Sequence, residues 1–162
     1  MKLWKRAAPA FACAGALLVP AGCAFSASPA DGLTFQPPPG WNASPGIMGF
    51  MQFWRPPSND REVLMLFRSP KPLNESDVLS TQQLHGTLQD MTIERRSTIQ
   101  ICGHQPASYV EGRGHSNKGE ENVQMVMTNA RGTTYLALYV RPADQAPNTA
   151  AQTAVRELCA KP

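Results

Sequence analysis

Cysteine and histidine are the residue types in this 162-residue chain whose chemistry could define a site. Cys102, His104 and Cys159 could bind a metal ion through two thiolates and one imidazole. Only three ligands are present, and neither a C-x-x-C pair nor an H-x-x-x-H helix accompanies them. In an oxidising compartment two such cysteines most simply form a disulfide. We therefore predict a Cys102–Cys159 bond and keep the metal site as the alternative.

Residues 1–22 have the composition of a signal peptide. An apolar stretch of about a dozen residues follows three basic ones and is too short to span a bilayer about 30 Å thick as a helix. Ala21 and Gly22 precede Cys23 as in the bacterial lipobox, where the cysteine receives a diacylglyceryl group before signal peptidase II cleaves in front of it. The usual leucine of that motif is replaced by Pro20. We expect Cys23 to be the lipidated first residue of the mature protein.

Two alternatives to lipidation remain open. Signal peptidase I could cleave after Ser26, with Ala24 at the small −3 position, and give a secreted or periplasmic soluble protein. The leader could also remain as an uncleaved membrane anchor. In the lipidated case residues 23–32, which are small and polar, form a flexible tether. The protein then lies in the cell envelope and faces the periplasm or the exterior.

The charge distribution indicates which kind of partner is not expected. Lys2, Lys5 and Arg6 account for the whole formal net charge of +3, and the 12 basic residues that follow balance 12 acidic ones. Binding to a phosphate backbone needs a basic surface. Nucleic acid is therefore not expected as a partner.

Residues 33–162 have the length of one domain with one sizeable core. Alternating and continuous apolar runs predict strands at 50–54, 63–67, 93–101, 107–112, 123–127 and 133–140. Two of these, 63–67 and 135–140, are apolar at nearly every position and must be covered on both faces.

Two helices are predicted beside these strands. The first follows Asn74 and has Leu84, Leu88 and Met91 on one face, and the second begins at Thr149 and carries Cys159 in its last turn. The fold class is therefore α+β, an antiparallel sheet of about six strands with two helices packed on it.

This order of elements resembles the PsbP-like layered sandwich of the extrinsic photosystem subunit, the Ran-binding Mog family and several bacterial envelope lipoproteins. The resemblance covers nearly all of 33–159. It rests on the opening Pro39-Gly40-Trp41, the helix after the second long strand, the strand 135–141 and the closing helix. It implies a non-enzymatic binding or assembly module and transfers no functional residue, because that fold hosts unrelated functions.

Residues 112–119 are rich in glycine and predict a hairpin tip. A phosphate-binding loop is not expected there, because Lys118 is followed by glycine and glutamate rather than by Ser or Thr and a helix. We take His115, Asn117 and Lys118 of this tip, together with Trp54, as a candidate interaction surface.

No catalytic residue or cofactor is assigned. The sequence has no G-x-S-x-G or H-E-x-x-H motif, and His85, His104 and His115 fall in separate elements. We expect a non-catalytic module whose partners are the membrane, through its lipid anchor, and another envelope protein. The alternative is a small secreted hydrolase or metal-dependent enzyme, which a cleft joining His104 or His115 to Glu111 and a serine would favour.

Overall fold

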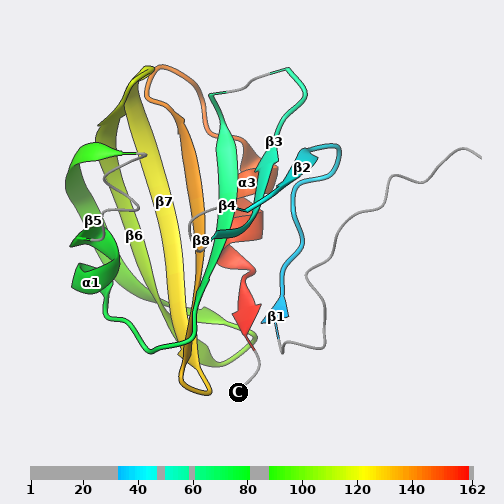
Figure 1. Ribbon diagram of the computed structural model, residues 1–162, viewed down its shortest axis with the longest axis vertical. Helices are drawn as coiled ribbons and strands as arrows, with labels where there is room; N and C mark the ends of the chain where they lie inside the picture. Colours follow the sequence, from blue (N-terminus) through cyan, green and yellow to red (C-terminus); the bar gives the residue numbers. More distant parts are fainter. Residues whose placement is uncertain (1–32, 47–49, 59–60, 81–87, 161–162) are drawn as a thin grey trace, which may run out of the picture.

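The computed structural model describes residues 33–46, 50–58, 61–80 and 88–160. Within them a strongly curved antiparallel sheet has the strand order β2-β3-β4-β8-β7-β6-β5 (Figure 1). The seven strands are β2 (Asn42–Pro45), β3 (Phe50–Arg55), β4 (Val63–Ser69), β5 (Gln89–Ile101), β6 (Gln105–Ser116), β7 (Gly119–Ala130) and β8 (Thr133–Pro142). A separate two-stranded ladder pairs β1 (Leu33–Thr34) with β9 (Cys159–Ala160). The described helices are α1 (Glu75–Ser80) and α3 (Thr149–Arg156).

The centre of the sheet is where the sequence predicts it. β8 lies between β4 and β7, and all its residues from 134 to 140 are buried. β4 is buried from Val63 to Leu66. Continuous apolar strands are therefore covered on both faces, as predicted.

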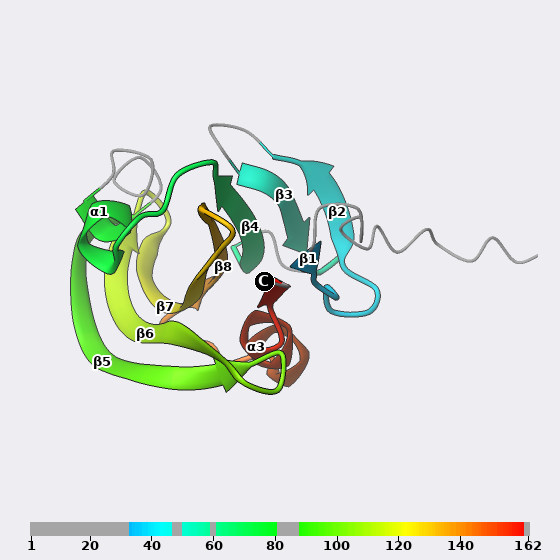
Figure 2. The ribbon, with the colours of Figure 1, turned by 90° about the horizontal axis from the view of Figure 1, so that it is seen from below.

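Each face of the sheet packs against its own apolar cluster. One cluster joins Tyr109 and Tyr139 of the sheet to Val155 and Leu158 beside β9. The other joins the opposite face to α1 through Val78. Figure 2 shows α1 and α3 on opposite sides of the curved sheet. The α+β layered arrangement is thus confirmed.

The strand number is larger than the six predicted. β2 has the sequence Asn-Ala-Ser-Pro and is mostly exposed, so it lacks the apolar pattern from which strands are recognised. Its proline has no hydrogen to donate, which is tolerated because β2 is an edge strand. The opposite edge, β5, is also largely exposed.

Both helices differ from their predicted limits. α1 is described over Glu75–Ser80, and Leu84 falls outside the described residues. Met91, predicted on the same apolar face, lies in β5. α3 ends at Arg156, and its cap is Asn148, whose side chain accepts from the Ala151 amide at 3.2 Å. Cys159 is therefore in β9 rather than in the last helical turn.

Candidate functional site

The disulfide defines one end of the molecule. Cys102 in the β5–β6 turn is bonded to Cys159 in β9, with the Cα atoms 5.2 Å apart. Thr34 of β1 pairs with Cys159, so the chain enters the described domain here (Figure 1). The predicted disulfide is confirmed. Because the two sulfur atoms are bonded to each other, they are not thiolates that could bind a metal ion together with His104.

Two further segments reach the same end. The β7–β8 turn lies next to the β5–β6 turn, because Gln105 donates from Nε2 to Thr128 Oγ1 at 3.0 Å. The segment after β4 joins them through Leu73, whose backbone amide donates to Thr134 Oγ1 at 2.7 Å. We call this region the entry end and define it as residues 68–73, 101–105 and 129–134 with β1 and β9.

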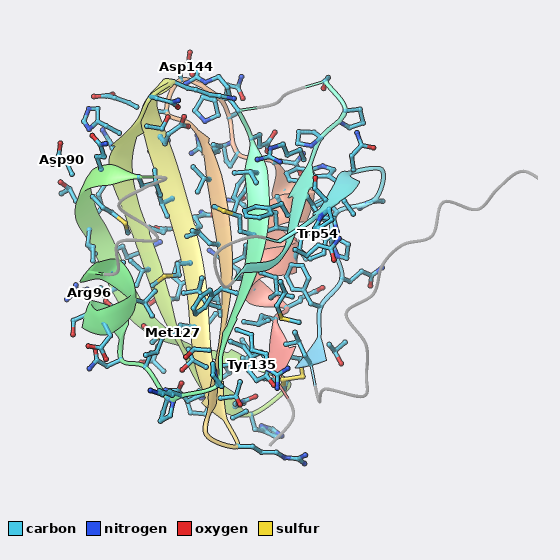
Figure 3. All side chains as sticks on the ribbon, viewed as in Figure 1. Trp54, Asp90, Arg96, Met127, Tyr135 and Asp144 are labelled. Atoms are coloured by element: carbon cyan, nitrogen blue, oxygen red, sulfur yellow. A yellow bond between two sulfur atoms is a disulfide. The ribbon has the colours of Figure 1, made fainter. Side chains whose placement is uncertain are left out.

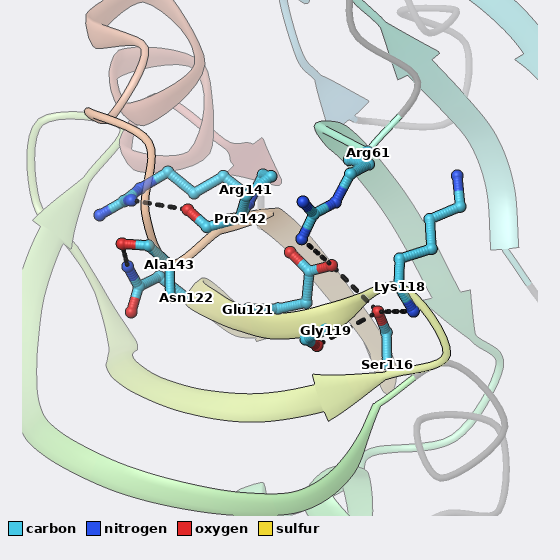
Figure 4. A network of polar contacts seen from close by, with 9 residues as sticks. All are labelled: Arg61, Ser116, Lys118, Gly119, Glu121, Asn122, Arg141, Pro142 and Ala143. Carbon is cyan, nitrogen blue, oxygen red and sulfur yellow. Dashed lines mark hydrogen bonds and ion pairs between the residues drawn. The ribbon is translucent and has the colours of Figure 1, made fainter.

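The predicted hairpin tip forms the opposite end. Ser116 pairs with Gly119 across a two-residue turn, and Asn117 and Lys118 are exposed in that turn. Ser116 Oγ accepts from the Lys118 amide at 3.0 Å and lies 3.0 Å from Glu121 Oε1, to which it can donate (Figure 4). The turn is thus held by side-chain contacts at its base.

Glu121 fixes the tip to the rest of the sheet. Its side chain is 3% exposed, and Oε1 lies 3.7 Å from Arg61 Nη2 in the segment before β4. Such a carboxylate is costly to bury without a cation. The contact therefore holds the β6–β7 tip against the β3–β4 side of the sheet (Figure 4).

A β-bulge arranges charges beside the tip. The register between β5 and β6 shifts between Ile93 and Arg95, so Glu94 is the extra residue. A bulge turns two successive side chains toward one face. Glu94 reaches Arg113 Nε at 2.8 Å, and Arg95 reaches Glu111 Oε2 at 3.2 Å. Two consecutive residues of β5 thus pair with two residues of the same face of β6.

A polar hollow of about 280 Å³ lies between this bulge and the tip. We call it the distal hollow; its lining residues are Asp90, Thr92, Glu94, Arg113, Gly114, His115 and Glu120. Three carboxylates face one guanidinium, and His115 Nε2 is 3.5 Å from Glu120 Oε1. The hollow therefore carries more negative than positive charge. In Figure 3 Asp90 lies closer to the end of the sheet that carries the tip than to the entry end.

A hydrogen-bonded cluster continues from the hollow toward α3. Glu111 accepts from the Tyr109 hydroxyl, from Arg95 and from Gln124. Arg156 of α3 donates to Tyr109 Oη at 3.1 Å and lies over its ring, with Cζ 4.9 Å from the centroid. This cluster attaches α3 to the sheet.

The cluster shifts the pKa values of its members. Partial burial by itself would raise the pKa of Glu111, but the three donors outweigh burial and leave that pKa below its ordinary value. Burial and the hydrogen bond to Glu111 raise the pKa of Tyr109. Glu111 is therefore an ionised acceptor in this cluster, and Tyr109 a neutral donor.

The predicted surface residues divide into two groups. His115, Asn117 and Lys118 are exposed at the tip. Trp54 is 2% exposed and packs on Phe35 with ring centroids 5.2 Å apart, so its assignment to an interaction surface is wrong (Figure 3). In β3 its apolar ring belongs to the core. Cys23 and His85 lie outside the described residues.

The cleft that would favour an enzyme is not formed by the described residues. His104 and His115 lie at opposite ends of β6, and His115 contacts Glu120 rather than Glu111. Ser108 Oγ donates to Glu75 and contacts no histidine. No group of three His, Cys, Asp or Glu side chains among the described residues is placed to hold a metal ion.

A second hollow lies beside α3. Its volume is about 510 Å³, and it is lined on one side by Gln36 to Pro39 and on the other by Thr149, Ala150, Thr153, Ala154 and Glu157. Among its lining residues only Glu157 has an ionisable side chain. Sequence reasoning found neither hollow, because each combines residues far apart in the chain.

The arrangement of elements is found in solved structures. The chain matches the solution structure of cyanobacterial PsbP (CyanoP) from Synechocystis sp. PCC 6803 with a TM-score of 0.57 and 18% identity, covering 78% of this chain and 85% of that one. This chain has the PsbP-like fold. The predicted resemblance is thereby confirmed at the level of the fold.

A second solved structure also matches the fold. A crystal structure from Bacteroides thetaiotaomicron VPI-5482 matches this PsbP-like chain with a TM-score of 0.54 and 12% identity, covering 83% of this chain and 47% of that chain. No protein-family model and no curated protein matches the sequence. Among the described helices, none has the length and apolarity needed to cross a membrane.

Proposed function

We propose that this protein is an exported, lipid-anchored envelope module that binds another envelope protein without catalysing a reaction. Cys23 carries the anchor, and the tip with the distal hollow forms the binding surface. The observation that carries the proposal is that the entry end and the tip lie at opposite ends of β6.

The distance between the two ends is comparable to the reach of the segment that would carry the anchor. β6 has 12 residues, which at about 3.3 Å per residue extend about 40 Å along the strand. Cys23 precedes Leu33 by ten residues, and such a segment spans at most about 35 Å. An anchor at Cys23 therefore keeps the entry end within about 35 Å of the membrane and allows the tip to point away from it.

The charge of the distal hollow indicates the chemistry of the partner. Among the residues that line the hollow, Asp90, Glu94 and Glu120 are acidic and Arg113 is basic. Complementary potentials steer partners together and select among them. We infer that a basic segment of the partner contacts the hollow.

The enzyme alternative has less support. His115 lies 3.5 Å from Glu120, but the neighbouring Ser116 hydroxyl is bonded to the Lys118 amide and to Glu121. Glu111, the carboxylate that a triad would need, is already bonded to three donors. These observations favour binding over catalysis.

Site-specific photocrosslinking in envelopes of the native host tests the proposal. A photoreactive residue replaces Asn117 in one variant and Thr153 in another, since both positions are exposed but Thr153 lines the α3 hollow. We expect a discrete protein adduct from position 117 that position 153 does not give. The adduct should disappear with Glu120→Lys and persist with Asp144→Lys.

Asp144 is the matched control, because it is exposed at the same end but does not line the hollow (Figure 3). An adduct from position 153 alone would move the binding surface to α3. An adduct from position 117 that survives Glu120→Lys would contradict the role of the hollow.

A further inference from the structure

The sheet-end segments of the entry end carry basic residues without acidic ones. Its three sheet-end segments, residues 68–73, 101–105 and 129–134, contain Arg68, Lys71, His104 and Arg131 but no aspartate or glutamate. All four of these side chains are exposed. Three carry a full positive charge at neutral pH, and His104 adds charge only when it is protonated.

The opposite end is mixed in charge. Residues 116–121 and 141–145 hold Lys118 and Arg141 together with Glu120, Glu121 and Asp144. The chain after the leader is formally neutral, so the basic end reflects segregation of charge rather than an overall excess. A neutral domain with one basic end has a defined electrostatic orientation in the field of an anionic surface.

Two glutamates lie close to the entry end in the chain. Glu75, which follows the 68–73 segment, bonds to Arg96 Nε at 2.7 Å and accepts from Ser108 at 2.6 Å. Glu157 lies before β9 but lines the hollow beside α3. Tyr135 holds Arg68 in place, with the guanidinium Cζ 6.0 Å from the ring centroid.

We propose that the entry end lies against anionic phospholipid headgroups, with Arg68, Lys71 and Arg131 as the contacting cations. This inference rests on the proposed anchoring at Cys23, because the ten residues before Leu33 keep this end within reach of the bilayer. Each cation at an anionic membrane surface favours the bound orientation by about fivefold. The contact fixes the direction of the sheet, which a lipid anchor on a flexible tether does not do.

The test uses the acylated mature protein in vesicles of phosphatidylcholine, with and without one third phosphatidylglycerol. A water-soluble amine-acetylating reagent is added, and peptide mass spectrometry measures the labelling rates of Lys71 and Lys118. These two lysines belong to opposite ends of the same molecule, so Lys118 is the internal control. We expect phosphatidylglycerol to slow Lys71 labelling by at least threefold and to leave Lys118 unchanged.

Salt and two substitutions test whether the protection of Lys71 is electrostatic. The protection of Lys71 should vanish in 0.5 M salt, because the Debye length falls to a few ångströms. Arg131→Asp should reduce it, and Lys118→Glu should not. Aspartate is chosen because Arg131 has φ of 50°, a left-handed conformation that Asp and Asn tolerate best among residues with a side chain.

The outcomes separate the two proposals. Equal Lys71 labelling in both kinds of vesicle, with the protein attached, overturns the lipid contact and leaves the anchor intact. Protection that survives high salt or Arg131→Asp also overturns it, because the cations then do not cause it. Protein that stays free of both vesicles contradicts the anchor and, with it, this inference.

Discussion

Tyr139 joins a buried carboxylate to the start of the last helix. Its hydroxyl donates to Glu62 Oε1 at 2.5 Å and accepts from the Asn148 amide at 3.0 Å. Tyr139 is 1% exposed and Glu62 8% exposed. Burial and the bond to Glu62 raise the pKa of Tyr139 well above its usual range. One side chain in the central strand thus connects the β4 side of the sheet to the cap of α3.

Tyr139→Phe should therefore destabilise the domain without creating a large cavity. It leaves the Glu62 carboxylate and the Asn148 amide each without a buried partner, at about 1–3 kcal/mol for each group. We expect the free energy of unfolding in urea to fall by about 2–6 kcal/mol. Tyr139→Phe combined with Glu62→Gln should be less destabilising than the sum of the two changes, because they remove the same contact. Unchanged stability of the single variant would contradict the role of this hydroxyl.

Loss of the Cys102–Cys159 bond should loosen the entry end first. The bond spans a sequence separation of 57, for which the chain-entropy model gives about 4 kcal/mol. We expect the Cys102→Ser, Cys159→Ser double variant to melt many degrees lower. In hydrogen exchange, the amides of β1 and β9 should lose protection before those of β8. Protection lost equally in β8 would show that the bond supports the whole sheet instead.

Glu111 should contribute a pH-dependent part of the stability. Its pKa is lower in the folded protein than in the unfolded chain, so its stabilising effect is complete above the unfolded value of about 4.3 and is lost as the pH falls through the folded value. Unfolding measured between pH 6 and pH 2 should show a shallower acid loss for Glu111→Gln than for the wild type. Parallel curves would contradict the ionised state of Glu111 in the cluster.

Gly112 is required by close approach of β5 to β6. A Cβ at this position would lie 2.6 Å from the Thr92 carbonyl oxygen, and backbone cannot move aside as a side chain can. Gly112→Ala should cost about 1–3 kcal/mol and raise hydrogen exchange along β5. Gly103→Ala is the control, since its φ of +84° also disfavours alanine but a Cβ there meets nothing within 4 Å. Equal increases in hydrogen exchange along β5 in Gly112→Ala and Gly103→Ala would contradict the close contact.

The sequence predicts those features that depend on strong local patterns. Residues 63–67 of β4 and 135–140 of β8 are apolar at every position, as is typical of strands covered on both faces. The turn at Asn117 follows from glycine and polar residues between two strands. The disulfide follows from counting, because Cys13 lies in the expected leader and Cys23 is expected to carry lipid, which leaves Cys102 and Cys159.

The remaining features depend on tertiary contacts. β2 is held by pairing with β3, and nothing in Asn-Ala-Ser-Pro predicts it. The spacing of Leu88 and Met91 predicts one face of a helix, but Leu88 lies just before β5 and Met91 lies within it. The bulge at Glu94 adds one residue to a ladder, and no residue type marks it. The distal hollow depends on that bulge, so its position could not be derived from spacing alone.

The central claim, an anchor at Cys23 that places the domain at a membrane, is tested most directly by the N-terminal peptide of the mature protein from its native host. The account predicts that this peptide begins at Cys23, carries a diacylglyceryl group and comes from the membrane fraction. Cys23→Ser should leave an uncleaved or mislocalised precursor. A mature chain that begins after Ser26, lacks lipid and is found in the soluble fraction would contradict the account.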